Sequence, residues 1–217
     1  MSPSRVTVVD YGIGNLYSVQ RACETVGASV ELTSDPMVIS RAERLILPGV
    51  GAFADGIAGL RARALVEPLQ AFAASGRPLL GICLGMQMLA DTSEEFGEHD
   101  GLGLIPGRVV QLPTTDTNGR LHHIPRVGWT ALAPVPQTSW ASTPLRDTAP
   151  GACVYLVHSY HVVCNDPMHV LAVSHYGGHP LTSAIHSGNV TGFQFHPERS
   201  GPEGLRILRA FLSDAPS

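Results

Sequence analysis

The sequence lacks any long apolar run. Nowhere do about 18 apolar residues follow one another, and the N-terminus, MSPSRVTVVD, has neither the charged start nor the apolar stretch of a secretion signal. A basic run that could follow a phosphate backbone is also missing, since 14 Lys and Arg stand against 18 Asp and Glu. We therefore expect a soluble, cytoplasmic protein with no membrane segment and no nucleic-acid partner.

Cysteine is scarce, and no two cysteines have the CxxC spacing of a zinc knuckle. The four residues, Cys23, Cys83, Cys153 and Cys164, lie in unrelated local contexts, which argues against a disulfide framework. A small buried side chain is the simplest interpretation of each except Cys83. Only Cys83 has a local sequence that indicates chemistry.

The order of elements predicts an α/β fold in one domain that spans residues 1–217. The length and the 44% hydrophobic content suffice for one well-filled core, and there is no repeat or linker. The first half alternates strands with helices, which calls for a mostly parallel sheet covered on both faces. Strands are expected at residues 5–10, 29–32, 44–47 and 78–82, and helices at residues 15–26, 56–75 and 86–95.

The second half has a different pattern. Short runs rich in Val, Ile, Leu and Tyr, such as CVYLVHSYHVV and HVLAVSHY, are separated by Pro, Gly and His and predict further strands, several of them antiparallel. Residues 114–123 and 134–151 are polar or rich in Pro and Ser, so we expect surface loops there. The tail after Gly204 has the apolar spacing of a closing helix.

The segment RPLLGICLGMQML places Cys83 at the end of a buried strand and directly before a helix, with Gly81 and Gly85 on either side. Small neighbours permit the sharp turn of a nucleophile elbow, which projects the side chain above the sheet edge. The helix dipole would favour the thiolate, and the N–H of Leu84 would lie where an oxyanion develops. A cysteine that only packs in the core would give the same pattern, so this segment alone leaves both interpretations open.

A nucleophilic cysteine needs a base, and the base needs a group that orients it. Among ten histidines, His196 follows the apolar strand of NVTGFQFHPERSG, at the sheet edge where open α/β folds bind ligands. Glu198 lies two residues later, on the same side of an extended chain, and Pro197 stiffens the link. An isolated HPE would more often be a surface turn, but its combination with the elbow favours a catalytic pair.

A third segment, LPGVGAF at residues 47–53, ends an apolar strand in Pro-Gly-x-Gly. The glycines tolerate backbone angles that leave amide groups free to point toward a developing negative charge. Most glycine-rich loops only turn the chain, so this segment is weak evidence on its own.

Together, the GxCxGxQ elbow, the upstream glycine loop and the late HPE resemble class I glutamine amidotransferases. The resemblance implies a flavodoxin-like α/β fold and a glutaminase mechanism without a metal or an organic cofactor. It assigns Cys83 as the nucleophile, His196 as base and acid, and Glu198 as the carboxylate that orients the histidine. It further implies an oxyanion hole at Gly51 and Leu84, and contacts to the substrate L-glutamine from Gln87, Ser159 and Tyr160.

Within that family, the chain resembles the glutaminase subunits of imidazole glycerol phosphate synthase. The matching segments run in order along almost the whole chain and include VVDYGIGNLYSVQRA, LPGVGAF, GICLGMQ, GLGLIPGRV, VGWT, YLVHSY and GFQFHPERSG. The resemblance implies a heterodimer with a (β/α)8 cyclase subunit that consumes the ammonia in histidine biosynthesis. A partner is expected independently, because no part of the chain is left over for an ammonia-acceptor site.

Four positions depart from the pattern of those subunits. Arg126, Thr130, Tyr17 and His161 stand where His, Asn, Arg and Tyr are usual. None belongs to the catalytic set, so hydrolysis should survive. In the resembling subunits these segments lie toward the synthase, so a paralogous subunit that supplies another synthase, such as one that amidinates a cell-surface sugar, stays an alternative.

Three functions of other classes have weaker support. A nucleotide-binding module would use the Gly12-x-Gly14 turn, but the third glycine of the fingerprint is missing near Tyr17. A metal hydrolase would use the histidines of the second half, where HSYH gives H-x-x-H without an HExxH helix. A cysteine peptidase would share the Cys83 elbow and would react with peptide electrophiles rather than glutamine analogues.

Overall fold

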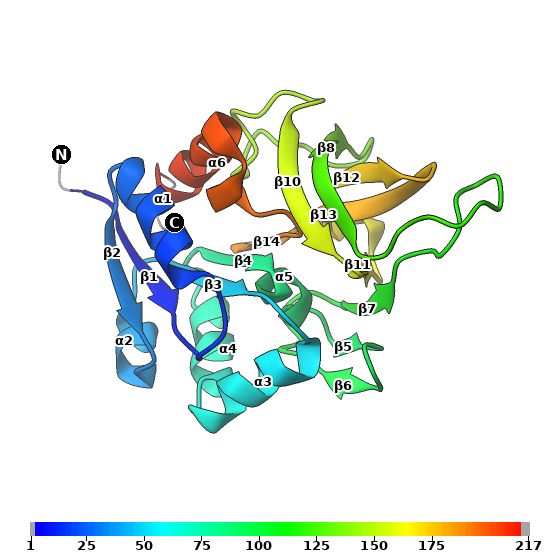
Figure 1. The fold of residues 1–217 in the computed structure, drawn as a ribbon. Helices are drawn as coiled ribbons and strands as arrows, with labels where there is room; N and C mark the ends of the chain where they lie inside the picture. The colour runs from blue at the N-terminus through cyan, green and yellow to red at the C-terminus, as the bar shows by residue number, and fades with distance from the viewer. Residues whose placement is uncertain (1–2, 214–217) are drawn as a thin grey trace.

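A central sheet of eight strands organises the molecule (Figure 1), and the computed structural model describes residues 3–213. Its strands are β1 (Arg5–Val9), β2 (Ser29–Thr33), β3 (Leu45–Gly49), β4 (Leu79–Cys83), β9 (Ala133–Pro134), β12 (Val170–Tyr176), β13 (His179–Ser187) and β14 (Val190–Phe193). They lie in the order β2-β1-β3-β4-β14-β13-β12-β9. The first five in this order are parallel, and the other three extend the sheet in antiparallel pairing.

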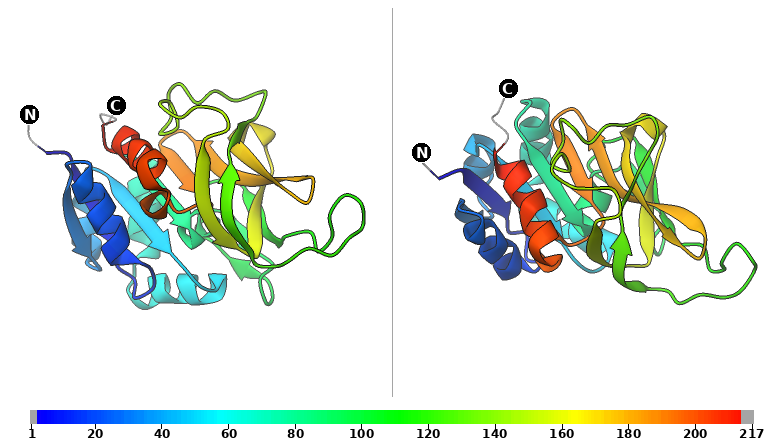
Figure 2. Two further views of the ribbon diagram at one scale, coloured as in Figure 1. Left: turned by 45° about the horizontal axis from the view of Figure 1, so that its top comes forward. Right: turned by 90° about the horizontal axis from the view of Figure 1, so that it is seen from above.

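Helices cover both faces of this sheet (Figure 2). They are α1 (Leu16–Thr25), α2 (Pro36–Arg41), α3 (Phe53–Ala62), α4 (Val66–Ala74), α5 (Leu84–Met88) and α6 (Gly201–Ser213), with two 3-10 turns, η1 (Pro167–His169) and η2 (Pro197–Arg199). Helices α1 and α6 contribute to one apolar cluster, whereas α2, α3, α4 and α5 contribute to the other. Successive residues of β3 alternate between the clusters, since Leu45 and Leu47 face one and Ile46 the other.

Two smaller sheets are formed by strands between residues 92 and 164. A four-stranded sheet has the order β11-β7-β5-β6 and a two-stranded sheet pairs β10 with β8. Their strands are β5 (Thr92–Ser93), β6 (His99–Asp100), β7 (Gly107–Gln111), β8 (Arg126–Ala131), β10 (Cys153–His158) and β11 (Tyr160–Cys164). The predicted α/β fold with a mostly parallel sheet and additional antiparallel strands is confirmed. The loop between β7 and β8 projects from the molecule (Figure 1), as expected for a polar segment.

The single helix predicted over residues 56–75 is wrong. The chain forms α3 and α4 instead, with a break at Ala64, which has a positive φ of 53°. Pro68 explains the break, because a proline has no N–H to donate to the carbonyl of Ala64 and its ring would clash there. Pro68 lies in the first turn of α4, where the missing donor costs nothing.

The helix predicted over residues 86–95 is also wrong in extent. Helix α5 begins at Leu84 and ends at Met88, and Thr92 and Ser93 form β5. Pairing of β5 with β6 on one side and β7 on the other replaces the helical hydrogen bonds. Helix α2 was not predicted, although Asp35 accepts a hydrogen bond from Met37 N at 2.8 Å and Pro36 follows at the first helical position.

Within residues 3–213, no helix has both the length and the apolar character needed to cross a membrane.

Close approach between β3 and the start of α5 requires glycine at position 85. A Cβ atom on Gly85 would lie 1.8 Å from the carbonyl oxygen of Leu47. Gly85→Ala should therefore lower the free energy of unfolding by about 3 kcal/mol or more, despite the better helix propensity of alanine. Gly188→Ala is the control, since its Cβ meets open space and only the positive φ of 58° costs about 1 kcal/mol. Equal losses in urea unfolding would contradict this account.

Candidate active site

Cys83 ends β4, and α5 begins at the next residue. Its backbone has φ 55° and ψ −109°, a conformation that L-residues rarely adopt. Glycines on both sides make the turn possible, because a Cβ on Gly81 would lie 2.7 Å from the carbonyl oxygen of Gly85. The expected strand-turn-helix geometry is present. The backbone strain of the turn falls on Cys83, the residue whose side chain the turn projects.

His196 lies three residues beyond the end of β14, the strand that pairs in parallel with β4. Its Nδ1 atom donates to Oε1 of Glu198 at 2.8 Å, and both side chains are buried, with 4% and 1% exposed. The hydrogen bond was expected from an extended backbone over residues 196–198, but only His196 is extended. His196 has extended angles, whereas Glu198 lies in η2, so a tight 3-10 turn brings the carboxylate to the ring.

The charge state of His196 depends on two neighbours. Burial opposes the positive charge, but interactions with Cys83 and Glu198 outweigh it and raise the pKa of His196 to about 10. Its Nε2 atom is buried and has no hydrogen-bond partner within the described part of the chain. Since Nδ1 is held by Glu198, Nε2 is the nitrogen left for proton transfer.

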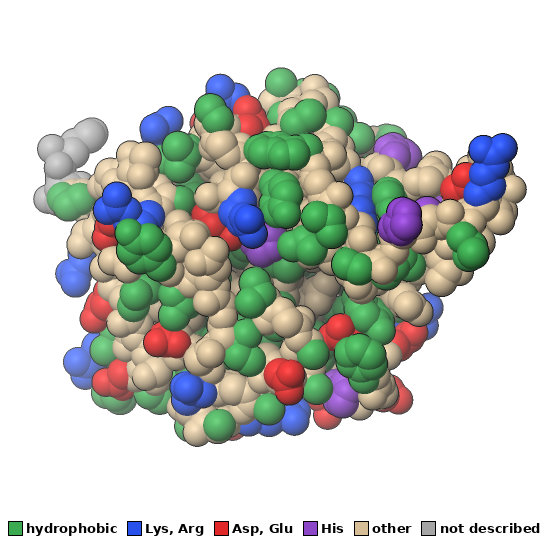
Figure 3. Space-filling view, viewed as in Figure 1, with side chains coloured by type: hydrophobic (Ala, Val, Ile, Leu, Met, Phe, Trp, Pro, Cys, Tyr) green, Lys and Arg blue, Asp and Glu red, His purple; other side chains and the backbone are tan. Residues whose placement is uncertain are grey.

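A pocket of about 340 Å³ unites the predicted site residues. The middle of the molecular face is hollowed where β4 meets α5 (Figure 3). The lining includes seven of the eight residues named from the sequence: Cys83, His196, Gly51, Leu84, Gln87, Ser159 and Tyr160. The eighth, Glu198, lies behind His196, where it holds the imidazole ring.

Glu95 is a lining residue that the sequence did not indicate. Its Oε2 atom accepts a hydrogen bond from Phe53 N at 2.6 Å, which caps α3 in the absence of a side-chain cap at Ala52. The carboxylate thus anchors the end of the segment LPGVGAF and also faces the pocket. No pattern in the SEE tripeptide distinguishes it from an exposed acidic residue.

Gln194 is a second residue that was missed. It is fully buried directly after β14, and its Nε2 atom lies 3.7 Å from the sulfur of Cys83. A signal was present in the sequence, because a glutamine between two phenylalanines interrupts an otherwise apolar strand end.

The histidines of the H-x-x-H segment are buried rather than arranged around a metal. Burial lowers the pKa of His158 to about 4 and that of His161 to about 4. Nδ1 of His158 lies 2.9 Å from the carbonyl oxygen of Tyr160. Among residues 3–213, no group of three or more His, Cys, Asp or Glu side chains is placed to hold a metal ion.

Two of the four unusual residues contact each other. Arg126 is buried, and its Nη2 atom donates to Oγ1 of Thr130 at 2.6 Å and to the carbonyl oxygen of His175 at 3.0 Å. Nη1 donates to Oγ of Ser174 at 2.9 Å. The guanidinium group therefore ties β8 to β12 inside the protein, and the large apolar side chains that β8 exposes are those of Val127 and Trp129.

The chain belongs to the class I glutamine amidotransferase family, whose model, "Glutamine amidotransferase class-I", matches residues 7–215. Within this family, it is 47% identical to "Imidazole glycerol phosphate synthase subunit HisH 1" of Legionella pneumophila (strain Lens), over 96% of this chain and 99% of the relative. It is 45% identical to "Imidazole glycerol phosphate synthase subunit HisH" of Syntrophotalea carbinolica, over 95% of this chain and 98% of the relative.

Solved structures share the fold at lower identity. "Structure of PurLQS from Thermotoga maritima" matches with a TM-score of 0.70 and 23% identity, over 98% of each chain. "Crystal structure of glutamine amidotransferase" matches with a TM-score of 0.68 and 20% identity, over 95% of this chain and 96% of the other.

The buried histidines predict how stability changes with pH. An unfolded histidine takes up a proton near pH 6.5, whereas His158 and His161 resist protonation down to about pH 4. The unfolded state therefore binds more protons in this window, and the free energy of unfolding falls as the pH falls. His161→Tyr removes one of the two contributions and should reduce the slope by up to about 1.4 kcal/mol per pH unit.

Urea unfolding at a series of pH values measures this slope. His175→Tyr is the matched control, because His175 is exposed and its substitution should leave the slope unchanged. A slope in His161→Tyr equal to that of the wild type between pH 6.5 and 4 would contradict the burial argument.

Proposed function

We propose that this chain is the glutaminase subunit of an imidazole glycerol phosphate synthase. It hydrolyses L-glutamine to glutamate and ammonia, and the ammonia passes to a cyclase subunit in histidine biosynthesis. The relatives named HisH support the choice of synthase, because the match covers nearly the full length of both chains. The observation that carries the chemistry is the single pocket in which Cys83, at a strained elbow, meets the His196–Glu198 pair.

In the first step, the Cys83 thiolate attacks the side-chain amide carbon of glutamine. The sulfur electron pair forms the S–C bond, and the carbonyl electrons move to oxygen, which becomes an oxyanion. Backbone N–H groups of Leu84 and of the Gly51 loop stabilise this charge. Gly51 lines the pocket and has a positive φ of 94°, a backbone conformation that glycine adopts readily and that leaves its peptide group able to turn toward the pocket.

In the second step, protonated His196 gives its proton to the leaving nitrogen as the C–N bond breaks, so ammonia departs and a glutamyl thioester remains. A water molecule then attacks the thioester carbon through its oxygen. The neutral imidazole takes a proton from this water as the C–O bond forms. Collapse of that intermediate expels the thiolate and releases glutamate. Glu198 keeps the ring oriented through both steps, and the mechanism requires no metal or organic cofactor.

Substrate recognition is proposed for the polar groups around the sulfur. Gln87, Ser159 and Tyr160 line the pocket and can orient the amide and carboxylate of glutamine. Glu95 contributes a negative charge at the wall, which complements the α-ammonium group of an amino acid. We further propose that residues 1–217 act as one glutaminase domain, with the acceptor chemistry on the partner.

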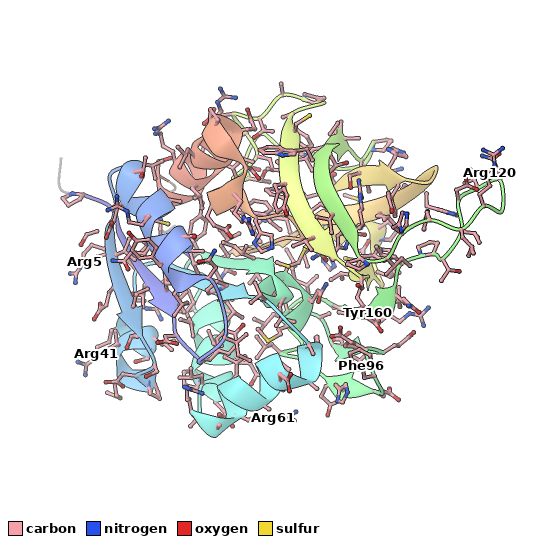
Figure 4. The ribbon with its side chains drawn as sticks, viewed as in Figure 1. Arg5, Arg41, Arg61, Phe96, Arg120 and Tyr160 are labelled. Atoms are coloured by element: carbon pink, nitrogen blue, oxygen red, sulfur yellow. The ribbon has the colours of Figure 1, made fainter. Side chains whose placement is uncertain are left out.

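The partner is proposed to dock over the pocket mouth. Val50 lines this mouth, and the exposed Phe96 packs edge-on against Tyr160 at 6.5 Å between ring centroids. Trp129, 60% exposed, lies opposite Tyr155 on the strand pair β8–β10, whose residues Val157 and His158 line the pocket. Figure 4 labels Phe96 and Tyr160 at neighbouring places on this side of the molecule. A cyclase subunit seated here would cover the pocket and receive ammonia without loss to solvent.

The unusual residues Arg126 and Thr130 do not favour a different synthase. They bond to one another, and Arg126 is only 6% exposed, so a partner would contact Val127 and Trp129 instead. Tyr17 is 70% exposed and is the departure that a partner could contact. A synthase that amidinates a cell-surface sugar remains the competing proposal for this reason.

Cys83→Ala should abolish glutamine-dependent activity of the complex, because it removes the nucleophile that forms the thioester. Synthesis from added ammonium salts should continue, since the acceptor site lies on the cyclase subunit. Cys153→Ser is the control, because Cys153 is exposed and outside the pocket. Glutamine hydrolysis retained in Cys83→Ala would overturn the assignment.

Trp129→Ala should weaken the complex with the cyclase subunit. An exposed tryptophan in the centre of an interface typically contributes about 2 kcal/mol or more, which raises Kd roughly 30-fold. Met37→Ala is the control, because Met37 is 57% exposed on α2, on the β2 side of the sheet (Figure 1). Titration calorimetry that gives the same Kd for both variants would argue against this docking surface.

A further inference from the structure

Gln194 is a polar side chain in the apolar core next to the nucleophile. None of it is exposed to solvent, and it lies one residue beyond the end of β14. Its backbone N–H is already bonded to the carbonyl oxygen of Ser183 at 2.9 Å. The side chain reaches in the other direction, to Gln87 and to the sulfur of Cys83. A buried amide is costly unless its contacts compensate, so these two contacts explain its presence.

Gln87 fixes which end of the Gln194 amide faces the sulfur. Nε2 of Gln87 donates one hydrogen to the carbonyl oxygen of Tyr160 at 3.0 Å and the other to Oε1 of Gln194 at 3.1 Å. A backbone carbonyl can only accept, so the Gln87 amide cannot be reversed without loss of its bond to Tyr160. Oε1 of Gln194 is therefore the acceptor, and its Nε2 donor faces Cys83 Sγ at 3.7 Å.

A backbone acceptor also lies near the sulfur. The carbonyl oxygen of Val157 lies 3.9 Å from Sγ and can accept the hydrogen of a neutral thiol. This carbonyl oxygen cannot stabilise a thiolate, because a thiolate accepts hydrogen bonds and a carbonyl oxygen has no hydrogen to donate. Gln194 supplies such a donor from the core side, whereas His196 supplies a charge from the pocket side.

We propose that Gln194 is a further catalytic residue of the glutaminase reaction, because its side-chain N–H donates to the Cys83 sulfur and stabilises the thiolate. Gln87 then has a second role as the positioning residue for Gln194. The inference rests on the proposed function. In the attack, the sulfur electron pair moves into the S–C bond and the contact weakens. When the thioester is hydrolysed, the S–C bond breaks and the pair returns to a sulfur that already has a donor in place.

Alkylation of Cys83 by iodoacetamide, followed across pH, tests this on the full chain without glutamine. Gln194→Met keeps the length and removes the donor, so Cys83 should react roughly 10- to 100-fold more slowly at pH 7, and its half-maximal rate should move to higher pH. Gln194→Glu keeps the acceptor for Gln87, replaces the donor by a carboxylate and should move the profile further. The negative charge of the new carboxylate would by itself disfavour the Cys83 thiolate. Gln194→Met, which adds no charge, is therefore the variant that tests whether the lost donor matters.

Two controls separate this role from a structural one. Mass spectrometry of the digested protein reports Cys83 and the exposed Cys153 in the same sample, and the Cys153 profile should be identical in all variants. Thr191→Val removes a buried polar group from β14, three residues before Gln194, where Oγ1 of Thr191 lies 3.0 Å from Nδ1 of His186. It should lower thermal stability without any change at Cys83, which shows that destabilisation alone does not move the profile.

The outcomes distinguish this inference from the proposed function. A wild-type profile for Cys83 in folded Gln194→Met overturns the donor role, even if the wild-type complex hydrolyses glutamine normally. A shifted profile, together with a kcat for glutamine that falls while KM stays constant, supports it. If the profile shifts but the wild-type complex does not use glutamine, the donor to the sulfur stands and the proposed function fails.

Discussion

Strands β4 and β14 pair in parallel, with Phe193 opposite Ile82, and the active site depends on this pairing. It places Cys83, the last residue of β4, and His196, three residues beyond the end of β14, at the same edge of the sheet although they are far apart in the sequence. Close packing around the elbow maintains the relative positions of Cys83 and His196. Glycines at positions 81 and 85 allow the backbone of α5 to lie against β3 and β4, where any larger residue would collide with main-chain atoms.

Burial strengthens the electrostatic interaction between His196 and Glu198. His196 and Glu198 are almost inaccessible to solvent, so their attraction is weakly screened and each must be compensated by its partner. Interactions with Cys83 and Glu198 raise the pKa of the imidazole to about 10, and Glu198 holds the ring at Nδ1. A histidine that carries its proton at neutral pH beside a cysteine is suited to protonate a leaving nitrogen, which is the step that amide hydrolysis needs.

Local sequence was enough to identify the elbow and the HPE pair, because both depend on neighbours within two residues. It was not enough for Glu95, whose bonded partner Phe53 lies 42 positions away, or for Gln194, whose partners Gln87 and Cys83 lie 107 and 111 positions away. The helical spacing of apolar residues also gave a wrong prediction at Thr92 and Ser93. These residues pair with β6 and β7 as strand β5 instead of continuing the helix. Pro68 is a signal in the sequence from which the break before α4 could have been predicted. The sequence gives no comparable signal for the 3-10 turn at Glu198.

Cys83 is proposed as the nucleophile in a pocket shaped for glutamine. The most direct measurement is mass spectrometry of the protein after incubation with 6-diazo-5-oxonorleucine, a glutamine analogue that alkylates the attacking group. We expect one adduct, on the peptide that contains Cys83, and protection of that residue by excess glutamine. An adduct on the exposed Cys153, or no protection by glutamine, would contradict it.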